Sequence, residues 1–362
     1  MKAKAMVLKA FNAPLSFEEY EVPALAEGQV LVKIVAAGVC GSDVHMWKGE
    51  DPRTPLPIIL GHEGVGTIVA MKGAKQTVDG EALAEGDLIL WHRSVSCNGC
   101  YYCAILNEPW LCRNRKVYGI NMSSAVAPHL NGCYAEYVVL QTGTDIFKVS
   151  PGIDPAVLVS ASCSGSTVAH AFDLQSPRYG DTVLVQGPGP LGLYAIAFAK
   201  SLGAGKVIVI GGSENRLAVC REFGADIVLN RRQTTVEERR EAVLAATNGR
   251  GADMAVEAVG QPSAVEEGLK LVRPGGTYLS VGFSQPPGET SVDFFREVVS
   301  KNIRIQGVWV SSTRHTLPAM RLAEANQQLF AKTVTHRFPL AEATDALKVM
   351  ADREALKAVL IP

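Results

Sequence analysis

The chain has 362 residues, more than one hydrophobic core usually serves, so two domains are expected. Its 35 basic and 36 acidic side chains give a net charge of −1, which excludes a large cationic field for nucleic acid or membranes. No uncharged apolar stretch is long enough to span a bilayer, and residues 1–9 lack the pattern of a signal peptide. We therefore expect a cytoplasmic protein whose clustered cysteines bind metal rather than form disulfides.

The first 160 residues are expected to form a mostly β domain. Residues 6–8, 30–35 and 86–91 are short apolar runs, which are typical of strands. Frequent glycine and proline separate these runs and leave little helical periodicity. Residues 97–133 are rich in loop-forming residues, so few regular elements are expected there.

Two short motifs in this domain supply ligands for a metal. They read Gly-Val-Cys-Gly-Ser-Asp-Val-His, which contains Cys40, and Gly-His-Glu-Gly-Val-Gly, which contains His62. A thiolate and an imidazole are ligands that Zn²⁺ prefers. Ser42 and His45 add a hydroxyl and a second imidazole, the groups needed to move a proton from an alcohol to solvent.

Four further cysteines form the strongest single signal in the chain. Cys97, Cys100 and Cys103 are spaced Cys-x-x-Cys-x-x-Cys, and Cys112 follows. Four thiolates complete a tetrahedral zinc site without an open position, so such a site is structural. On ligand type alone, an iron–sulfur cluster competes with zinc.

From about residue 155 the chain alternates short apolar strands with helical segments. This alternation predicts a parallel, doubly wound sheet with both faces covered by helices. The expected strands are 182–186, 207–210, 252–257 and 276–281, and the expected helices are 191–202 and 215–223. A last segment from about residue 311 contains an amphipathic helix at 341–350 and an apolar run at 358–361.

A glycine-rich turn follows the first of these strands and opens the first of these helices. Its pattern is Gly-x-Gly-x-x-Gly, the fingerprint of a dinucleotide site in this context. The first glycine allows the tight turn, the second admits a pyrophosphate, and the third lets helix and strand pack closely. The predicted cofactor-binding residues of the turn are Gly187, Gly189, Pro190, Leu191 and Gly192.

The end of the second strand bears on the choice between NAD and NADP. Where NAD-binding folds carry an acid that holds the ribose hydroxyls, this chain has Gly211. Ser213 and Arg216 offer a hydroxyl and a guanidinium to a 2′-phosphate, whereas Glu214 is the alternative, as a displaced acid. We expect the chain to accept NAD(P), with a slight preference for NADP.

The two ligand motifs, the cysteine cluster and the glycine turn resemble those of zinc-dependent medium-chain alcohol dehydrogenases, a family that includes polyol and secondary-alcohol dehydrogenases. The resemblance covers essentially the whole chain. It implies an α/β protein with a GroES-like, mostly β catalytic domain at 1–160 and a doubly wound Rossmann domain at 161–310. It also implies that segment 311–362 returns to the catalytic domain, and we expect a homodimer or homotetramer.

The resemblance also implies roles for single residues at the metal. Cys163 is the third ligand of the catalytic zinc, and Asp43 orients the ligand histidine. Glu63 is the alternative third ligand, or a transient ligand that helps water exchange.

Other implied roles concern the cofactor and the substrate. Thr167 is expected under the nicotinamide, flanked by Val281, Gly282 and a strand at 307–310. Candidate residues of the substrate pocket are Trp91, Arg93 and Val310. A charged wall at Arg93 favours a polyol or an acidic alcohol; the alternative is that Arg93 pairs with a protein carboxylate.

The sequence therefore predicts hydride transfer between a primary or secondary alcohol, including cyclic alcohols and polyols, and NAD(P). Two zinc ions per subunit are expected, with Ser42 accepting the alcohol proton and His45 passing it to solvent. Two other functions stay open. One is a zinc-free quinone or enone reductase of the same superfamily, against which the zinc ligands argue. The other is a zinc-lobe module that binds nucleic acid, against which the near-neutral charge argues.

Overall fold

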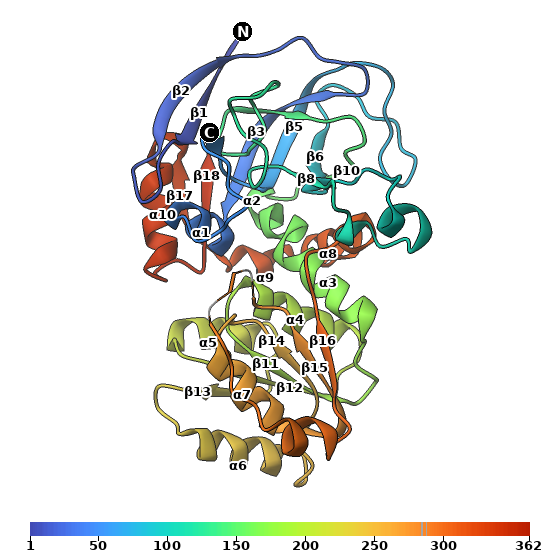
Figure 1. Ribbon diagram of the computed structural model, residues 1–362, viewed down its shortest axis with the longest axis vertical. Helices are drawn as coiled ribbons and strands as arrows, with labels where there is room; N and C mark the ends of the chain where they lie inside the picture. The colour runs from blue at the N-terminus through green and yellow to red at the C-terminus, as the bar shows by residue number, and fades with distance from the viewer. Residues whose placement is uncertain (284, 287) are drawn as a thin grey trace. The chain divides into compact units, whose positions relative to one another are not determined.

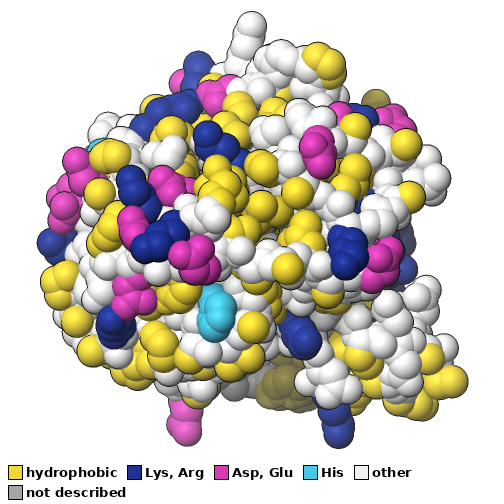
Figure 2. Space-filling model, turned by 90° about the horizontal axis from the view of Figure 1, so that it is seen from above, with side chains coloured by type: hydrophobic (Ala, Val, Ile, Leu, Met, Phe, Trp, Pro, Cys, Tyr) yellow, Lys and Arg dark blue, Asp and Glu magenta, His cyan; other side chains and the backbone are white. Residues whose placement is uncertain are grey.

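The computed structural model describes residues 1–283, 285–286 and 288–362 of the chain. It consists of two compact units, drawn in the colours of the chain order in Figure 1. Unit 1 comprises Met1–Cys163 and Ser312–Pro362, and unit 2 comprises Ser164–Ser311. No helix in the described residues is long and apolar enough to cross a membrane. On the face drawn in Figure 2, acidic and basic side chains are interspersed.

Unit 1 is built on a sheet of order β10-β6-β5-β3-β18-β17, with β9 also paired to β3. The last strand of the chain, β18, lies antiparallel to β3, so the C-terminal segment completes the sheet that the N-terminal segment begins. The strands are β3 (Val30–Val39), β5 (Glu63–Met71), β6 (Leu88–Trp91), β9 (Tyr137–Leu140), β10 (Ile146–Lys148), β17 (Val334–Pro339) and β18 (Lys357–Ile361).

Smaller elements complete unit 1. A second sheet has the order β2-β1-β4, and β7 pairs with β8. The strands are β1 (Lys2–Leu8), β2 (Ser16–Glu21), β4 (Ile58–Ile59), β7 (Ser94–Val95) and β8 (Lys116–Val117). The helices are α1 (Gly41–Lys48), α2 (Pro155–Leu158), α8 (Thr313–Ala325), α9 (Gln327–Ala331) and α10 (Ala343–Ala351). Short helical turns are η1 (Tyr101–Ile105), η2 (Pro109–Leu111), η3 (Val159–Ser162) and η5 (Leu340–Glu342).

Unit 2 is a six-stranded parallel sheet of order β13-β12-β11-β14-β15-β16. When the strands are numbered from the first strand of the unit, this is the strand order 3-2-1-4-5-6 of dinucleotide-binding folds. The direction in which successive strands are added to the sheet reverses between β11 and β14. The strands are β11 (Thr182–Gln186), β12 (Lys206–Gly211), β13 (Ile227–Asn230), β14 (Ala252–Glu257), β15 (Val272–Ser280) and β16 (Arg304–Gly307). The helices are α3 (Ser164–Leu174), α4 (Pro190–Ser201), α5 (Glu214–Glu222), α6 (Val236–Ala246) and α7 (Pro262–Leu271), and η4 (Phe295–Val299) is a short turn.

The predicted fold class, a mostly β domain with a doubly wound parallel sheet, is confirmed. One detail is wrong, because the strand expected at 307–310 ends at Gly307. The chain continues without regular structure to Val310, whose φ is +53°. That left-handed backbone angle cannot continue a strand.

Candidate metal centres and dinucleotide site

Four side chains of unit 1 that can bind a metal converge on one point. Cys40 follows β3, His62 precedes β5, Glu63 begins β5, and Cys163 follows η3. The antiparallel pairing of β3 with β5 sets Gly38 opposite Glu63 and so brings the two sequence motifs together. One ligand atom from each of the four residues lies within 4.8 Å of the others, and the Cys40 and Cys163 sulfurs are 3.9 Å apart.

The donor atoms of this buried cluster fit zinc. His62 Nε2 and Glu63 Oε1 are buried and have no hydrogen-bond partner within the described part of the chain. Buried polar atoms are normally hydrogen bonded, so two buried atoms without such a bond beside two cysteine sulfurs indicate metal ligands. Thiolate, imidazole and carboxylate are each ligands of zinc, and two cysteines with one histidine are a three-ligand set of catalytic zinc sites.

Asp43 orients the ligands of this cluster through hydrogen bonds. Its carboxylate accepts hydrogen bonds from the Cys40 amide at 2.8 Å, from His62 Nδ1 at 3.1 Å and from the Tyr134 hydroxyl at 3.2 Å. Because Nδ1 is engaged, Nε2 is the nitrogen left to bind a metal. Burial alone would lower the pKa of His62, but the Asp43 carboxylate outweighs it and raises this pKa to about 10 before a metal binds.

A buried ion pair between Lys357 and Glu63 also stabilises the cluster. Lys357 Nζ lies 2.7 Å from Glu63 Oε2 and also donates to the Val39 carbonyl at 3.2 Å. Burial raises the pKa of Glu63, and the ammonium opposes that rise. Tyr134 and Lys357 were not predicted from the sequence, since each lies far along the chain from its partner.

The predicted proton-relay residues share one face of α1. Ser42 and His45 are three residues apart, a spacing that places side chains together on a helix. Ser42 is partly buried, whereas the His45 side chain is 39% exposed and therefore reaches solvent. His45 Nδ1 lies 2.5 Å from a carboxylate oxygen of Glu50, which the sequence did not indicate.

Two of the predicted pocket residues, Arg93 and Trp91, are both buried but have different surroundings. Arg93 is 7% exposed, and its Nη1 donates to the Cys163 sulfur at 2.8 Å. The expected alternative, an ion pair with a protein carboxylate, is not found among the described residues. The pocket assignment of Trp91 is wrong, because this side chain is 1% exposed and packs in the hydrophobic core. Gly64 leaves room for it, since a Cβ there would lie 2.5 Å from the indole.

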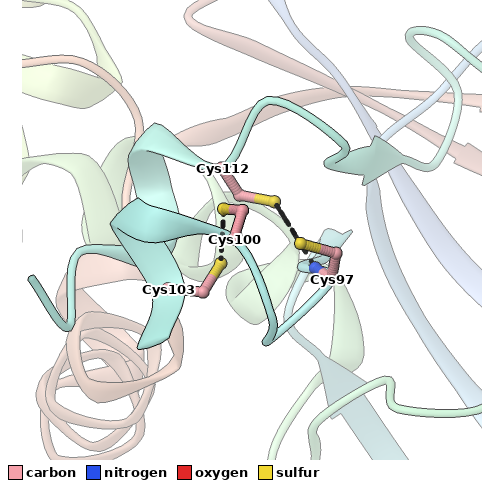
Figure 3. A group of neighbouring side chains, drawn as sticks. All are labelled: Cys97, Cys100, Cys103 and Cys112. Carbon is pink, nitrogen blue, oxygen red and sulfur yellow. Dashed lines mark hydrogen bonds between the residues drawn. The ribbon is translucent and has the colours of Figure 1, made fainter. Parts of the chain in front are cut away.

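The second cysteine cluster lies in a surface lobe of unit 1, drawn in Figure 3. Its four sulfurs lie within 4.8 Å of one another, with Cys100 and Cys103 3.5 Å apart and Cys97 and Cys112 also 3.5 Å apart. Hydrogen bonds to the sulfur, first from the Gly99 amide and then from Cys112, lower the pKa of Cys97 to about 6. Four sulfurs in this arrangement fit a closed tetrahedral metal site.

The lobe is attached to the rest of unit 1 by Trp110. This indole is buried, the Arg314 guanidinium lies 4.9 Å from its ring centre, and the His315 ring lies 5.6 Å away. Both partners belong to α8, so the lobe packs on the C-terminal part of unit 1.

In unit 2 the glycine turn has the geometry that the motif predicts. Gly187 has φ +108°, which favours glycine, and a Cβ on Gly192 would lie 1.8 Å from the Gly187 carbonyl oxygen. A Cβ on Gly189 would meet nothing within 4 Å, so the backbone there faces open space. Gly189 is also the N-cap of α4, which Pro190 and Leu191 open, and this helix start offers N–H groups to a phosphate.

The end of β12 has no room for the acidic side chain that NAD sites usually carry there. A Cβ on Gly211 would lie 2.7 Å from Pro188 Cγ in the glycine turn, so any side chain there would displace the turn. The alternative acid, Glu214, accepts hydrogen bonds from Arg221 and Asn230, both at 3.1 Å. Ser213 caps α5, and Arg216 lies in its first turn.

Two arginines that the sequence did not single out lie beside this position. A Cβ on Gly212 would lie 3.0 Å from Arg231 Nε and 3.6 Å from Arg232 Nε. Both residues follow β13, the neighbour of β12 in the sheet. Their location after a neighbouring parallel strand is the signal that could have revealed them.

A buried acid holds the loop that carries two of the residues expected near the nicotinamide, Val281 and Gly282. Glu257, at the end of β14, accepts the amides of Val259 and Gly260 at 2.6 Å and that of Gly282 at 3.2 Å. It therefore ties the loop that carries Val281 and Gly282 to the carboxyl end of the sheet. Thr167 is buried on α3 of the same unit.

Dinucleotide geometry and metal-ligand clusters in one chain define a nicotinamide-dependent oxidoreductase that acts on CH–OH groups. Residues 26–151 match the alcohol dehydrogenase GroES-like domain, and residues 190–325 match the zinc-binding dehydrogenase domain. The 5-exo-hydroxycamphor dehydrogenase of Pseudomonas putida is 35% identical over 351 residues, 95% of each chain.

Two solved structures extend the comparison. An alcohol dehydrogenase from Thermotoga maritima has a TM-score of 0.98 and 50% identity over the whole of both chains. A zinc-binding dehydrogenase from Sinorhizobium meliloti 1021, bound to NADP, has a TM-score of 0.86 and 26% identity over the whole of both chains. The chain belongs to the zinc-dependent medium-chain dehydrogenase/reductase family, and the resemblance noted in the sequence is confirmed.

Proposed function

We propose that the chain oxidises a secondary alcohol, cyclic alcohols included, at the cluster of Cys40, His62, Glu63 and Cys163. The observation that carries this proposal is the convergence of these four side chains within 4.8 Å, in which His62 Nε2 and Glu63 Oε1 are buried and have no hydrogen-bond partner among the described residues. The cyclic alcohol follows the name of the Pseudomonas putida relative. When bound, zinc supplies a Lewis acid and the nicotinamide supplies the hydride acceptor. The two ligand clusters argue against a zinc-free reductase.

The protein's own contribution at this cluster is orientation. Asp43 holds His62 through Nδ1, and we propose Cys40, His62 and Cys163 as zinc ligands, with Glu63 as an alternative or transient one. Lys357 balances the Glu63 charge, so this carboxylate can approach or leave the ligand set without becoming an isolated buried anion. The lobe cysteines are proposed to hold a second, structural zinc.

The proposed proton path runs along α1. Ser42 takes the hydroxyl proton of the substrate, and His45 releases it to solvent, since its side chain is partly exposed and paired with Glu50. The position of Ser42 and His45 on one face of α1 supports this order.

We further propose a slight preference for NADP. The glycine turn and the start of α4 bind the pyrophosphate. Ser213, Arg216, Arg231 and Arg232 lie near the end of β12, where Gly211 replaces the acid that holds the ribose hydroxyls in NAD sites, and their chemistry supports binding of a 2′-phosphate. The NADP bound by the Sinorhizobium meliloti relative is consistent with this preference.

The experiment for the cofactor compares kcat/KM for NADP and NAD. Arg231→Ser should move the ratio towards NAD by roughly 1.5–3 kcal/mol, the range for hydrogen bonds to charged groups. Arg240→Ser, an exposed change on α6, is the control. Gly211→Asp is a poorer test because its Cβ would press on Pro188. An unchanged ratio in Arg231→Ser would remove this arginine from cofactor recognition.

The experiment for the reaction is a panel of secondary, cyclic and polyhydroxy alcohols assayed with both cofactors. Secondary alcohols should be oxidised with release of NAD(P)H, and chelation of zinc should abolish the reaction. Turnover that survives complete zinc removal would contradict the proposal.

A homo-oligomer is proposed from the edge of the parallel sheet in unit 2. β16 is an edge strand, and large apolar side chains near it are exposed, namely Phe294, Phe295, Val299 and Ile305. An exposed apolar edge strand invites pairing with a second copy. Mass measurement in solution should give a dimer or tetramer that Ile305→Lys weakens, and a monomeric parent would refute it.

A further inference from the structure

Arg93 is a buried cation in contact with the metal-binding cluster of unit 1. The residue is 7% exposed, and its Nη1 donates to the Cys163 sulfur at 2.8 Å. This is the only hydrogen bond that the guanidinium makes to the described residues. Buried cations are normally paired with an anion, so the partner that this guanidinium requires is the thiolate form of Cys163, which is the form that binds a metal.

Backbone hydrogen bonds fix the position of Arg93. The residue lies between β6 and β7, where the neighbouring His92 amide donates to the Asp145 carbonyl at 2.9 Å. The Arg93 carbonyl accepts the Tyr118 amide at 3.1 Å. Arg93 and Cys163 both belong to unit 1, so the contact between guanidinium and sulfur is made within one compact unit.

The spacing of the two cluster cysteines fits one shared metal ion. The Cys40 and Cys163 sulfurs are 3.9 Å apart. Two sulfurs that each lie about 2.3 Å from one tetrahedral zinc ion are about 3.8 Å from each other. The position in which Arg93 holds the Cys163 sulfur is therefore one from which this sulfur can bind the same ion as Cys40.

The other candidate for the third ligand has a different cation as its partner. Glu63 is paired through Oε2 with Lys357, at 2.7 Å. No ion pair between Glu63 and Arg93 is found in the described parts of the chain. The two buried cations are thus divided between the two candidate ligands, with Lys357 at the carboxylate and Arg93 at the sulfur.

We propose that Arg93 is a positioning residue that holds Cys163 as the third zinc ligand and withdraws charge from its sulfur. The proposal rests on the proposed zinc-dependent function and leaves Glu63 as the transient ligand. An N–H donor reduces the charge that a thiolate gives to a bound ion, so the ion keeps more of its Lewis acidity. Arginine suits this position because it stays protonated when buried, whereas the pKa of a lysine shifts readily there.

The test is the absorption spectrum of the protein loaded with cobalt(II) in place of zinc. Cobalt(II) bound to thiolate gives a sulfur-to-metal charge-transfer band, whose energy falls when a hydrogen bond to the sulfur is lost. Arg93→Gln should therefore shift the band to longer wavelength, and Arg93→Met, which has no donor, should shift it further. Arg93→Lys keeps a charged donor and should restore most of the parent position. Circular dichroism checks that each variant is folded.

Two controls assign the shift to the buried cluster. Arg113→Gln removes an exposed arginine of the cysteine lobe and should leave the band unchanged. Cobalt in the lobe contributes equally to the parent and to the Arg93 variants, because Arg93 donates to no lobe sulfur in the described structure, so difference spectra remove it.

Cys163→Ser tests the ligand without any change at Arg93. It should remove the charge-transfer intensity of this sulfur, and Arg93→Gln added to Cys163→Ser should cause no further shift, since the two residues act through one contact. Unchanged intensity in Cys163→Ser would overturn the proposal, as would a band that stays in place in both Arg93→Gln and Arg93→Met.

Kinetics separate this proposal from the proposed reaction. Arg93→Gln should lower kcat for alcohol oxidation about 10- to 100-fold, the range for residues that support a metal ligand, and Arg93→Lys should recover part of the loss. A protein that shows the expected cobalt shifts but oxidises no alcohol would refute the alcohol dehydrogenase function and support the positioning role. Full alcohol oxidation with no cobalt shift would do the reverse.

Discussion

The two metal-binding clusters of unit 1 offer similar ligands in opposite surroundings. The cluster at Cys40 combines sulfur, imidazole and carboxylate in the interior and is contacted by charged side chains. The lobe cluster offers four sulfurs near the surface, stabilised largely by backbone amides and by one another. Catalytic zinc needs an exchangeable position and closed four-thiolate zinc has none, so the environment distinguishes a reactive from a structural site.

The largest effect is expected where the buried cluster loses its imidazole. His62→Ala should lose one of two zinc ions and nearly all turnover, because a catalytic zinc depends on three protein ligands. Zinc analysis, turnover and circular dichroism check this together, and the fold should be kept. Normal turnover with full zinc content would show that the cluster is not the reaction centre.

Removing a lobe ligand should mainly affect stability. Cys100→Ser should lose the other zinc and lower the Tm by about 4–10 °C, which corresponds to roughly 2–3 kcal/mol for a domain of this size. Tyr101→Ser, an exposed change in the same lobe, is the control. Thermal unfolding of both variants measures the difference, and an unchanged Tm in the zinc-free lobe would refute a structural role.

The next comparison concerns Asp43, which is hydrogen bonded to the ligand His62. Asp43→Asn should weaken zinc binding at the buried cluster about 10- to 100-fold, as for other groups that orient a ligand histidine. Tyr134→Phe removes only one of the three hydrogen bonds to Asp43 and should have a smaller effect. Competition with a chelator gives both affinities, and equal affinity in Asp43→Asn and the parent would contradict the orienting role.

The smallest effect is expected at the solvent end of the proposed relay. His45→Ala should slow turnover by about tenfold, less than the 10²–10⁴-fold typical of direct acid–base catalysis. Small bases added to the buffer should restore part of the loss. The pH–rate profile is the measurement, and a profile identical to that of the parent would remove His45 from the mechanism.

The features that short sequence motifs encode were predicted correctly from the sequence. The spacing of Cys97, Cys100 and Cys103 and the glycine turn at Gly187 specify local geometry, and the structure has that geometry. Sheet strands such as β11 were predicted correctly because buried parallel strands are continuous apolar runs. α6 was missed because few of its side chains are buried, so it lacks a clear apolar stripe.

The sequence could not reveal contacts that the topology creates. Lys357 reaches Glu63 only because β18 returns beside β3, and Tyr134 reaches Asp43 across 91 residues. Arg231 approaches Gly212 through the pairing of β12 with β13. Trp91 was misassigned because an aromatic residue at a strand end can face either the core or a pocket. Single residues of this kind carry no spacing pattern.

The most direct test of the contrast between the two clusters is zinc content per subunit, measured with turnover, in Cys40→Ser and Cys100→Ser prepared in parallel. Two zinc ions are expected in the parent and one in each variant. Turnover should disappear from Cys40→Ser, whereas Cys100→Ser should keep most of it at low temperature and lose stability. Loss of turnover in Cys100→Ser with full turnover in Cys40→Ser would contradict the assignment of a reactive buried site and a structural lobe.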